Sequence, residues 1–467
     1  MSAPFRSSIL VLALLSAVAG GSIARAEYGG NSGVLPAGSE LDDETATAKP
    51  RELFHSEAIQ GRKSYLVRLG DMAFSAPSLL GGAARQAGMS CDTCHVNGTS
   101  NPRLYVTGMS TVPGTFDTTG PLFNPKADNG VLDPVTIPSL RGARYQAPYG
   151  HDGRMGSLRD FVRGVIVNEF SGPEPSPEIL DAVVAYINDI DFLPNPRLDL
   201  DGKLKGTASE SEKRGEALFS QPFTHDPSLS CAGCHIPSAG FVDHRQHDVG
   251  SVGLFKTPTL LNANFNAPYF HDGRYSSYEQ VVIHFDRMFY LGLSAQDRQD
   301  LVAYLKAVGD GQEPYVADNV TTRLKEIADF VSVLDTAIPA HDGAVVALAQ
   351  DTIGGELRDF AEGFPERKDV TVTGGKEERS KARAALKEAV LAFHAVGTAA
   401  EAGKFDAAGV ALENFRAELA QSVPLLRAAE PWSIYNPEVR AARFAAFRNL
   451  YQQAVDPSLV ARRFDND

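Results

Sequence analysis

The chain has few cysteines, a single tryptophan and little basic charge for its length. Only 4 of its 467 residues are cysteine, so burial rather than a set of disulfides must hold the fold together. After the N-terminal segment, no apolar run is long enough to span a bilayer, which argues against a membrane-spanning domain. Acidic residues outnumber basic ones by 58 to 44. Because phosphates would repel such a surface, the composition also argues against a nucleic-acid-binding protein.

All four cysteines belong to two Cys-x-x-Cys-His motifs. This spacing is typical of c-type haem attachment, in which both sulfurs form thioether bonds and the histidine binds the iron. A zinc site would usually have four cysteine or histidine ligands together, and a thiol redox pair would not need the histidine. We therefore predict two covalent haems, held by Cys91, Cys94 and His95 and by Cys231, Cys234 and His235.

The N-terminus has the features of an export signal. Arg6 precedes an apolar stretch, residues 9–19, and Ala24-Arg25-Ala26 is a cleavage pattern. We predict a signal peptide over residues 1–26 and a periplasmic product; an uncleaved N-terminal anchor is the alternative. Cleavage would leave 42 basic against 58 acidic residues, a net charge of −16. Such a charge favours solubility, and it would also attract a basic electron-donor protein.

The chain contains an internal repeat. Residues 138–162 and 258–282 are identical at 12 of 25 positions without a gap, and both contain Ala-Pro-Tyr-x-His-Asp-Gly-Arg. Each copy follows its own haem motif and leads into a predicted helix that starts at a serine, Ser157 or Ser277. The first insert, residues 96–137, is rich in glycine and proline and is predicted to lack regular structure. A loop of this length is usually functional or mobile.

These features predict a mainly α-helical protein with two tandem c-type cytochrome domains, each with one covalent haem. The expected boundaries are residues 27–205 for the first domain and 206–312 for the second. Apolar residues recur at helical spacing in segments 376–396 and 405–423, and 440–455 looks like a further helix. Residues 313–467 are therefore predicted to form a C-terminal helical bundle, whose role the sequence does not indicate.

Two haem motifs, each followed by Pro-[Ser/Thr]-Leu and Ala-Pro-Tyr-x-His-Asp-Gly-Arg, resemble the bacterial di-haem cytochrome c peroxidase superfamily, which includes the MauG-like enzymes. The resemblance covers roughly Glu52 to Val308. It implies that the haem of His95 meets hydrogen peroxide and that the haem of His235 passes electrons to it. It also implies a carboxylate that moves protons during O–O cleavage, for which Glu169 is the matching residue.

The chain departs from this family at several positions. Phe161 stands where a glutamine commonly accompanies the catalytic glutamate, and His151 stands where the family often has an inter-haem tryptophan. We expect His151 and His271 to hydrogen-bond within their own loops, through Asp152 and Asp272 respectively. A histidine would be a poorer relay for electrons than an indole.

The resemblance also indicates further ligands. The position that ligates the second haem in relatives is Phe285 here, which cannot bind iron. The candidate distal ligands are therefore Met288 and His284, with Tyr275 as a weaker option. For the first haem, Met109 and Met155 are candidates for a ligand that leaves on activation. Backbone and amide oxygens of Asn266 and Pro268 match a calcium site of the family.

The resulting interpretation is a periplasmic di-haem peroxidase that reduces H2O2 to water. Its electrons would come from a small donor protein of cytochrome c or cupredoxin type. One alternative is a MauG-like oxidase that modifies a partner protein or another substrate, and another is a non-enzymatic di-haem electron carrier. A homodimer is compatible with the resemblance.

Overall fold

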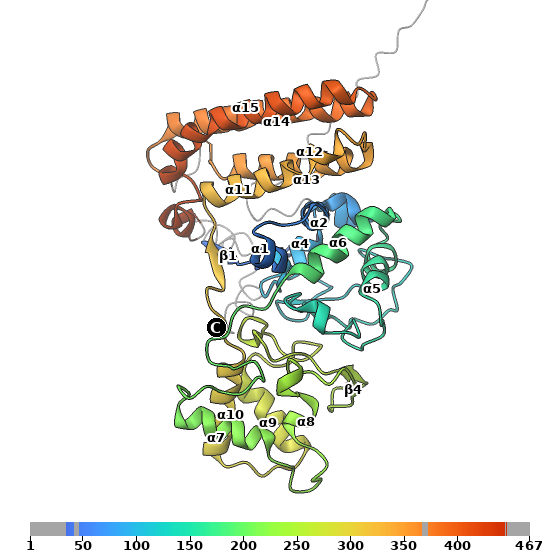
Figure 1. The fold of residues 1–467 in the computed structure, drawn as a ribbon, viewed down its shortest axis with the longest axis vertical. Coiled ribbons are helices and arrows are strands. Elements are labelled where there is room, and N and C mark those ends of the chain that lie inside the picture. Colours follow the sequence, from blue (N-terminus) through green and yellow to red (C-terminus); the bar gives the residue numbers. More distant parts are fainter. Residues whose placement is uncertain (1–33, 42–45, 367–371, 444, 446–467) are drawn as a thin grey trace, which may run out of the picture.

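The computed structural model describes residues 34–41, 46–366, 372–443 and 445. The fold is mainly α-helical, in agreement with the predicted class. Figure 1 shows three helical parts along the long axis, with the C-terminal helices at one end and the region around the second haem motif at the other. The predicted signal peptide and most of segment 440–455 lie outside the described residues.

We call residues 46–193 the first lobe. It contains the first haem motif, the long insert and the first copy of the repeat. Its elements are β1 (Ala48–Pro50), α1 (His55–Gln60), α2 (Tyr65–Phe74), η1 (Pro77–Leu79), α3 (Gly82–Gln86), α4 (Cys91–Cys94), η2 (Val96–Gly98), β2 (Thr115–Phe116), β3 (Val135–Thr136), η3 (Ala143–Tyr145), α5 (Leu158–Gly164), the π-helical turn η4 (Val165–Glu169) and α6 (Pro177–Asp189).

We call residues 194–312 the second lobe. It repeats the order of the first lobe with a shorter insert. Its elements are α7 (Glu210–Ser220), α8 (Cys231–Cys234), η5 (Pro237–Ala239), β4 (Gln246–His247), β5 (Phe255–Lys256), η6 (Ala263–Phe265), α9 (Tyr278–Met288) and α10 (Ala295–Val308).

A close helix crossing organises each lobe, and a glycine makes each crossing possible. Helix α2 packs on α6 in the first lobe, and α7 packs on α10 in the second. A Cβ built on Gly70 would lie 1.9 Å from the carbonyl oxygen of Ala182, and one on Gly215 would lie 2.0 Å from that of Asp300. Since atoms cannot approach so closely, only glycine permits these crossings. The two lobes therefore share the same internal construction.

The helices after the repeats begin where the sequence predicted. The Ser157 side chain accepts a hydrogen bond from the backbone N–H of Asp160 at the start of α5, and Ser277 accepts one from Gln280 at the start of α9. Both serines are N-caps, which satisfy backbone donors that lack a partner in the helix. The two helices then differ, because α5 continues as the π-helical turn that ends at Glu169.

The long insert is less loose than its composition suggested. Strands β2 and β3 pair antiparallel inside it. Apolar side chains of the insert form a second core together with residues of α3 and Phe170. Its buried members include Leu104, Val106, Met109, Phe116 and Phe123. The insert is therefore a packed part of the first lobe.

The C-terminal helices form a bundle that is continuous with the first lobe. They are α11 (Val320–Val331), α12 (Leu334–Ala337), α13 (Gly343–Glu362), α14 (Lys376–Glu401) and α15 (Phe405–Ala429), followed by η7 (Glu430–Trp432). Strand β6 (Tyr315–Ala317) pairs with β1 and leads the chain from the second lobe to this bundle. One buried apolar cluster includes side chains of both the first lobe and the bundle. The bundle is therefore anchored on the first lobe through a shared core.

Buried polar contacts reinforce this junction. The Lys63 ammonium lies 2.8 Å from Oδ2 of Asp71 and 3.4 Å from Oδ2 of Asp329, which belongs to α11. Burial alone would lower the pKa of Lys63, but the neighbouring carboxylates outweigh burial and raise it. The Thr352 hydroxyl of α13 also donates to the carbonyl of Met72 over 3.0 Å. A charged group buried with its partners fixes the bundle on one side of the first lobe.

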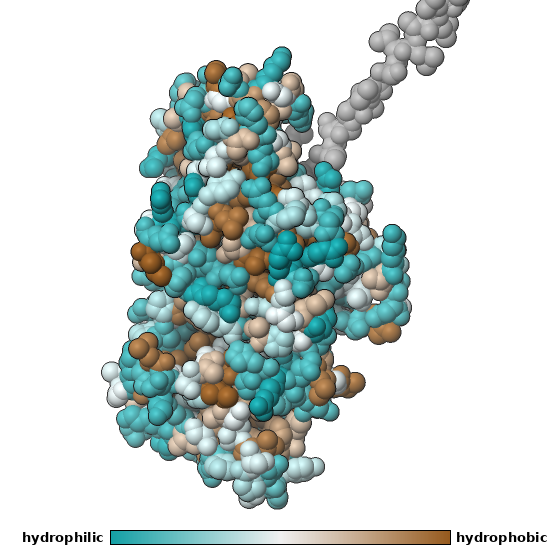
Figure 2. All heavy atoms as spheres, turned by 45° about the vertical axis from the view of Figure 1, so that its right-hand side comes forward, coloured by the Kyte–Doolittle hydropathy of each residue, from teal (hydrophilic) through white to brown (hydrophobic). Residues whose placement is uncertain are grey.

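No helix in the described part of the chain is both long and apolar enough to cross a bilayer. On the face drawn in Figure 2, hydrophilic side chains predominate and hydrophobic ones form small separate patches.

We expect Gly70→Ala to destabilise the protein by about 2–3 kcal/mol, because the added methyl group would force α2 and α6 apart. Thermal or urea unfolding of the full chain, followed by circular dichroism, would measure this loss. The matched control is Gly355→Ala in α13, where an added Cβ would meet nothing within 4 Å. This control should be neutral or should stabilise by up to about 1 kcal/mol. Equal effects of the two substitutions would contradict the tight crossing.

Candidate active site

The histidine of the first haem motif is oriented by backbone carbonyls. Nδ1 of His95 lies 3.0 Å from the carbonyl oxygen of Pro138 and 3.1 Å from that of Thr99. Carbonyl oxygens only accept hydrogen bonds, so Nδ1 must carry the hydrogen and Nε2 must keep a free lone pair. This tautomer suits a histidine that binds iron through Nε2.

The second motif is built in the same way. Nδ1 of His235 donates to the carbonyl oxygen of Phe241 over 3.1 Å and also interacts with that of Pro258. Pro138 and Pro258 are equivalent, since each is the first residue of its repeat. Burial lowers the pKa of both His95 and His235 below the ordinary value. Both imidazoles are therefore neutral, which is the form that can ligate a metal.

An aromatic pair connects each helix crossing with its motif histidine. In the first lobe the Phe74 ring lies 4.9 Å from the Tyr186 ring and 6.4 Å from the His95 ring, centroid to centroid. In the second lobe Phe219 lies 5.0 Å from Tyr304 and 6.3 Å from His235. The two motif histidines therefore have closely similar aromatic neighbours on the side of the helix crossing.

The two repeat loops meet between the lobes through reciprocal backbone hydrogen bonds. The N–H of Thr136 in β3 donates to the carbonyl of His271 over 2.7 Å, and the N–H of Lys256 in β5 donates to that of His151 over 2.9 Å. Thr136 and Lys256 each lie two residues before the repeat proline, so the two contacts are equivalent. The lobes are thus joined through the loops that follow their own haem motifs.

The expected bonds from His151 and His271 to Asp152 and Asp272 were wrong. Nε2 of His151 lies 2.7 Å from the carbonyl oxygen of Thr136, and burial lowers the pKa of this imidazole to about 4. The His271 ring instead stacks on Phe255, with 3.7 Å between centroids. The two aspartates pair with the arginines of their own motifs. Each histidine contacts the strand that precedes its own repeat, and the local sequence could not indicate this contact.

Glu169 ends the π-helical turn of the first lobe. Its Oε1 accepts a hydrogen bond from Nη2 of Arg154 over 2.7 Å. The Arg154 guanidinium lies over the Phe161 ring, 5.2 Å from its centroid. π-Helical turns occur often at functional sites. This one presents a partly buried carboxylate beside the first repeat motif.

The long insert holds the chain on both sides of Glu169. The Asn124 side-chain amide donates to the carbonyl of Asn168. Phe170 is buried and stacks on Phe116 with 5.9 Å between ring centroids. The insert therefore positions the end of the π-helical turn, and this gives the long loop a role.

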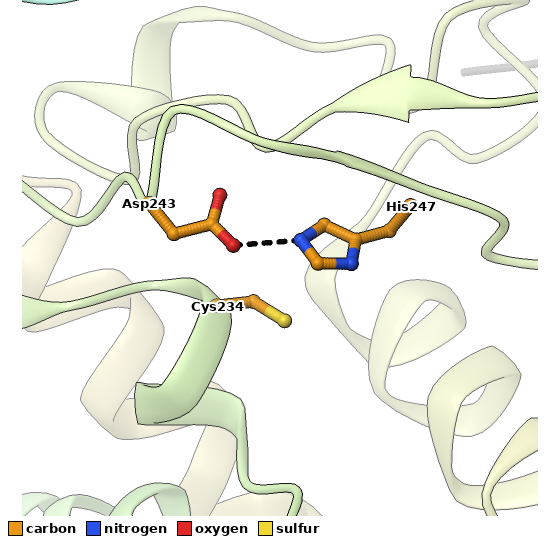
Figure 3. Close-up of side chains that lie close together, drawn as sticks. All are labelled: Cys234, Asp243 and His247. Carbon is orange, nitrogen blue, oxygen red and sulfur yellow. Dashed lines mark hydrogen bonds and ion pairs between the residues drawn. The ribbon is translucent and has the colours of Figure 1, made fainter.

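A second polar group lies beside the second haem motif. Cys234, Asp243 and His247 have ligand atoms within 4.8 Å of one another. Figure 3 shows the Asp243 carboxylate in contact with the His247 ring, and Nε2 lies 2.6 Å from Oδ2. Although burial raises the pKa of Asp243, hydrogen bonds from His247 and Thr257 lower it overall. Because Cys234 belongs to the haem motif, we interpret the other two residues as the wall beside the attachment site.

The candidate distal ligands of the second haem lie on α9. Nδ1 of His284 lies 2.9 Å from the Tyr275 hydroxyl, and Nε2 lies 2.7 Å from the carbonyl oxygen of Val249. Both ring nitrogens of His284 are thus engaged within the protein. Met288 lines a cavity of about 440 Å³ together with His284, Tyr275 and Gly250.

The candidate calcium residues lie between the lobes. A Cβ built on Gly114 of the first lobe would lie 2.8 Å from Cδ of Pro268, and the Ser100 hydroxyl donates to the carbonyl of Phe265 over 3.2 Å. Oδ1 of Asn266 is buried and has no hydrogen-bond partner among the described residues. An oxygen without a partner at this place fits a cation ligand.

The two methionines suggested for the first haem have other surroundings. Met109 is buried in the core of the insert, where a Cβ on Gly120 would lie 2.9 Å from its Cε. Met155 pairs through its backbone with Tyr149. The sequence motifs did not predict a role for Arg154 or Arg141. Both repeats contain an arginine at the position of Arg154, whereas Leu261 replaces Arg141 in the second repeat.

Parts of this chain are similar to known proteins. Residues 209–360 match the family model described as di-haem cytochrome c peroxidase. The gamma subunit of hydrazine synthase from Kuenenia stuttgartiensis is 27% identical over 53% of this chain and 78% of its own length. Cytochrome-c peroxidase IdrP1 from Pseudomonas sp. (strain SCT) is 37% identical over 25% of this chain and 44% of its own. MauG of Methylorubrum extorquens is 30% identical over 21% of this chain and 34% of its own.

Residues 209–360 thus match the di-haem cytochrome c peroxidase family, and further parts of the chain are similar to cytochrome c peroxidases and MauG proteins.

Proposed function

We propose that the two lobes are tandem cytochrome c domains and that each binds one covalent haem. Cys91 and Cys94 would attach the first haem, with His95 as the proximal ligand. Cys231, Cys234 and His235 would do the same for the second. The support is the fixed tautomer of both histidines, whose Nδ1 atoms donate to backbone carbonyls.

We further propose that the protein is a periplasmic peroxidase that reduces H2O2 to two water molecules with two electrons and two protons. When bound, the haems supply the iron that meets peroxide and the path for electrons. A small donor protein of cytochrome c or cupredoxin type would deliver electrons to the second lobe. A homodimer is compatible with this proposal.

The observation that carries the assignment of roles is the difference between the lobes. The first lobe has a carboxylate at Glu169, whereas the residue 120 positions later in the second lobe is Phe289. Phe289 packs against Phe223 and Phe285 and can move no proton. Glu169 would take a proton from one oxygen of hydrogen peroxide and deliver it to the other, from which water leaves.

The surroundings of Arg141 support the proposal that the first lobe binds a haem. This side chain is only 3% exposed, and its Nε has no hydrogen-bond partner. Nη2 donates to the carbonyl of Arg51 over 3.0 Å, and burial lowers the pKa of the guanidinium to about 10. No carboxylate of the described residues forms an ion pair with it. The anionic propionates of a haem are the kind of partner that such a buried cation lacks.

The calcium site stays a proposal that rests on Asn266 and Pro268. Asn266 would contribute its buried Oδ1, and Pro268 would contribute its carbonyl oxygen. A cation bound here would lie at the junction of the two lobes and would stabilise their contact.

We expect Glu169→Gln to lower peroxide turnover with a reduced donor by about 10²- to 10⁴-fold, because the amide cannot carry the proton. Steady-state turnover and the absorption spectrum would be measured together, and the haem content should not change. Glu174→Gln is the matched control, because Glu174 is an exposed glutamate paired with Arg163.

Unchanged turnover in Glu169→Gln would remove Glu169 as the acid–base group. Electron paramagnetic resonance of the half-reduced wild type addresses the wider proposal. Two low-spin signals that do not respond to peroxide would indicate the electron carrier. Oxidation of a partner protein by peroxide, without turnover of a reduced donor, would indicate the MauG-like alternative.

We expect Met288→Leu, but not His284→Gln, to convert the second haem from low spin to high spin. Both ring nitrogens of His284 already have partners, whereas the Met288 thioether lines a cavity. The absorption and paramagnetic resonance spectra of the two variants would be compared. A spin change in His284→Gln alone would reverse the assignment, and a change in neither would leave Tyr275 as the remaining candidate.

We expect Arg141→Leu to lower the reduction potential of the first haem. Loss of a nearby positive charge favours the ferric state, and about 1 kcal/mol corresponds to about 40 mV for one electron. Spectroelectrochemical titration would measure the reduction potentials of both haems, and the potential of the second haem serves as an internal reference. Arg159→Leu, which removes an exposed arginine paired with Asp181, is the control. No change in the first potential would contradict a haem partner for Arg141.

A further inference from the structure

Arg154 connects three groups around the end of the π-helical turn. Its Nη2 donates to Oε1 of Glu169 over 2.7 Å, and its Nη1 donates to Oδ1 of Asp152 over 3.0 Å. The guanidinium also lies over the Phe161 ring, 5.2 Å from its centroid. The cation thus brings a hydrogen-bond donor to the Glu169 carboxylate.

The second repeat provides an internal comparison. Arg274 is the equivalent arginine, and its Nε donates to both carboxylate oxygens of Asp272, over 2.9 Å and 2.7 Å. The position that matches Glu169 is Phe289, so Arg274 has no second carboxylate there. Arg274 therefore has the contacts expected of an arginine that only stabilises its own loop. Arg154 divides its donors between the loop and the glutamate.

The contact restricts one oxygen of Glu169 and leaves the other free. Only Oε1 is engaged, since no hydrogen bond in the described part of the chain reaches Oε2. The Glu169 side chain is 21% exposed and would otherwise have several rotamers. A planar guanidinium with fixed N–H directions holds a carboxylate in one orientation better than a flexible amine can.

We propose that Arg154 is a positioning residue that holds Glu169 by Oε1 and so directs Oε2 toward the molecule that gives up its proton. This inference rests on the proposed role of Glu169 as the acid–base group. In the first lobe Arg154 orients Glu169, while Asp152 keeps the arginine on its own loop. The equivalent arginine of the second lobe has only the structural part of this role.

Cyanide binding tests the proposal without turnover. At neutral pH the reagent is HCN, and it binds ferric haem as cyanide, so its proton must pass to a base. The association rate constant of cyanide at the first haem would be measured by stopped flow in haem-loaded wild type, Arg154→Leu, Glu169→Gln and the double variant. The ratio kcat/KM for peroxide would be measured in parallel.

We expect Arg154→Leu to lower both the cyanide association rate constant and kcat/KM for peroxide about tenfold. Misplacement of a reacting group by about 1 Å costs up to 10²-fold in rate. Arg274→Leu should leave both within twofold of wild type. The double variant should be no slower than Glu169→Gln, because a residue that acts through Glu169 has no effect once Glu169 is changed. Arg154→Lys should restore part of the loss.

Two results would overturn the proposal. One is a wild-type rate in Arg154→Leu, and the other is a double variant whose loss is the product of the separate losses. If Arg154→Leu does not fold, Arg154→Met replaces it, because the unbranched side chain can cover Phe161 and has no donor for Glu169. If Glu169→Gln changes neither quantity, the acid–base role itself fails. If Glu169→Gln lowers both and Arg154→Leu lowers neither, only the positioning role fails.

Discussion

The structure depends on one hydrogen bond that occurs twice, from Nδ1 of a motif histidine to the carbonyl of the first residue in a repeat. His95 makes it to Pro138, and His235 has the same relation to Pro258. This bond fixes the tautomer of the histidine and ties the repeat to the haem motif that lies upstream. The strand before each repeat also donates a hydrogen bond to the loop of the other lobe, so the repeats also take part in the contact between the lobes. The repeat is therefore the framework on which both sites are placed.

On this common framework the two lobes differ at a few positions that carry chemistry. Glu169 corresponds to Phe289, and Arg141 corresponds to Leu261. The first lobe thus has a carboxylate and a buried cation where the second has apolar side chains. The helix crossings, which need Gly70 and Gly215, are the same in both. Duplication kept the packing and changed the polar groups, and this pattern fits the proposed division into a reacting site and an electron-transfer site.

The sequence predicted the features that depend on local pattern. Each of these features depends on a few neighbouring residues: the haem motifs, the repeat, and the serine caps at Ser157 and Ser277. The structure confirms the two caps. The partner of His151 was predicted wrongly, because the residue that accepts its hydrogen bond lies in β3 rather than in its own loop. The contact between Arg154 and Glu169 depends on a π-helical turn, whose extra residue per turn leaves no clear pattern in composition.

The shared core of the first lobe and the C-terminal bundle also could not be predicted. Helical periodicity shows that α13 and α14 are amphipathic, but it does not show which surface their apolar side covers. In the structure the bundle covers the first lobe on the side opposite the second lobe. The first lobe is therefore enclosed at both ends, while the far end of the second lobe stays open to solvent. This arrangement of the lobes is compatible with the proposed function. A bulky donor protein can approach the second lobe, whereas the first lobe would need to admit only a molecule as small as peroxide.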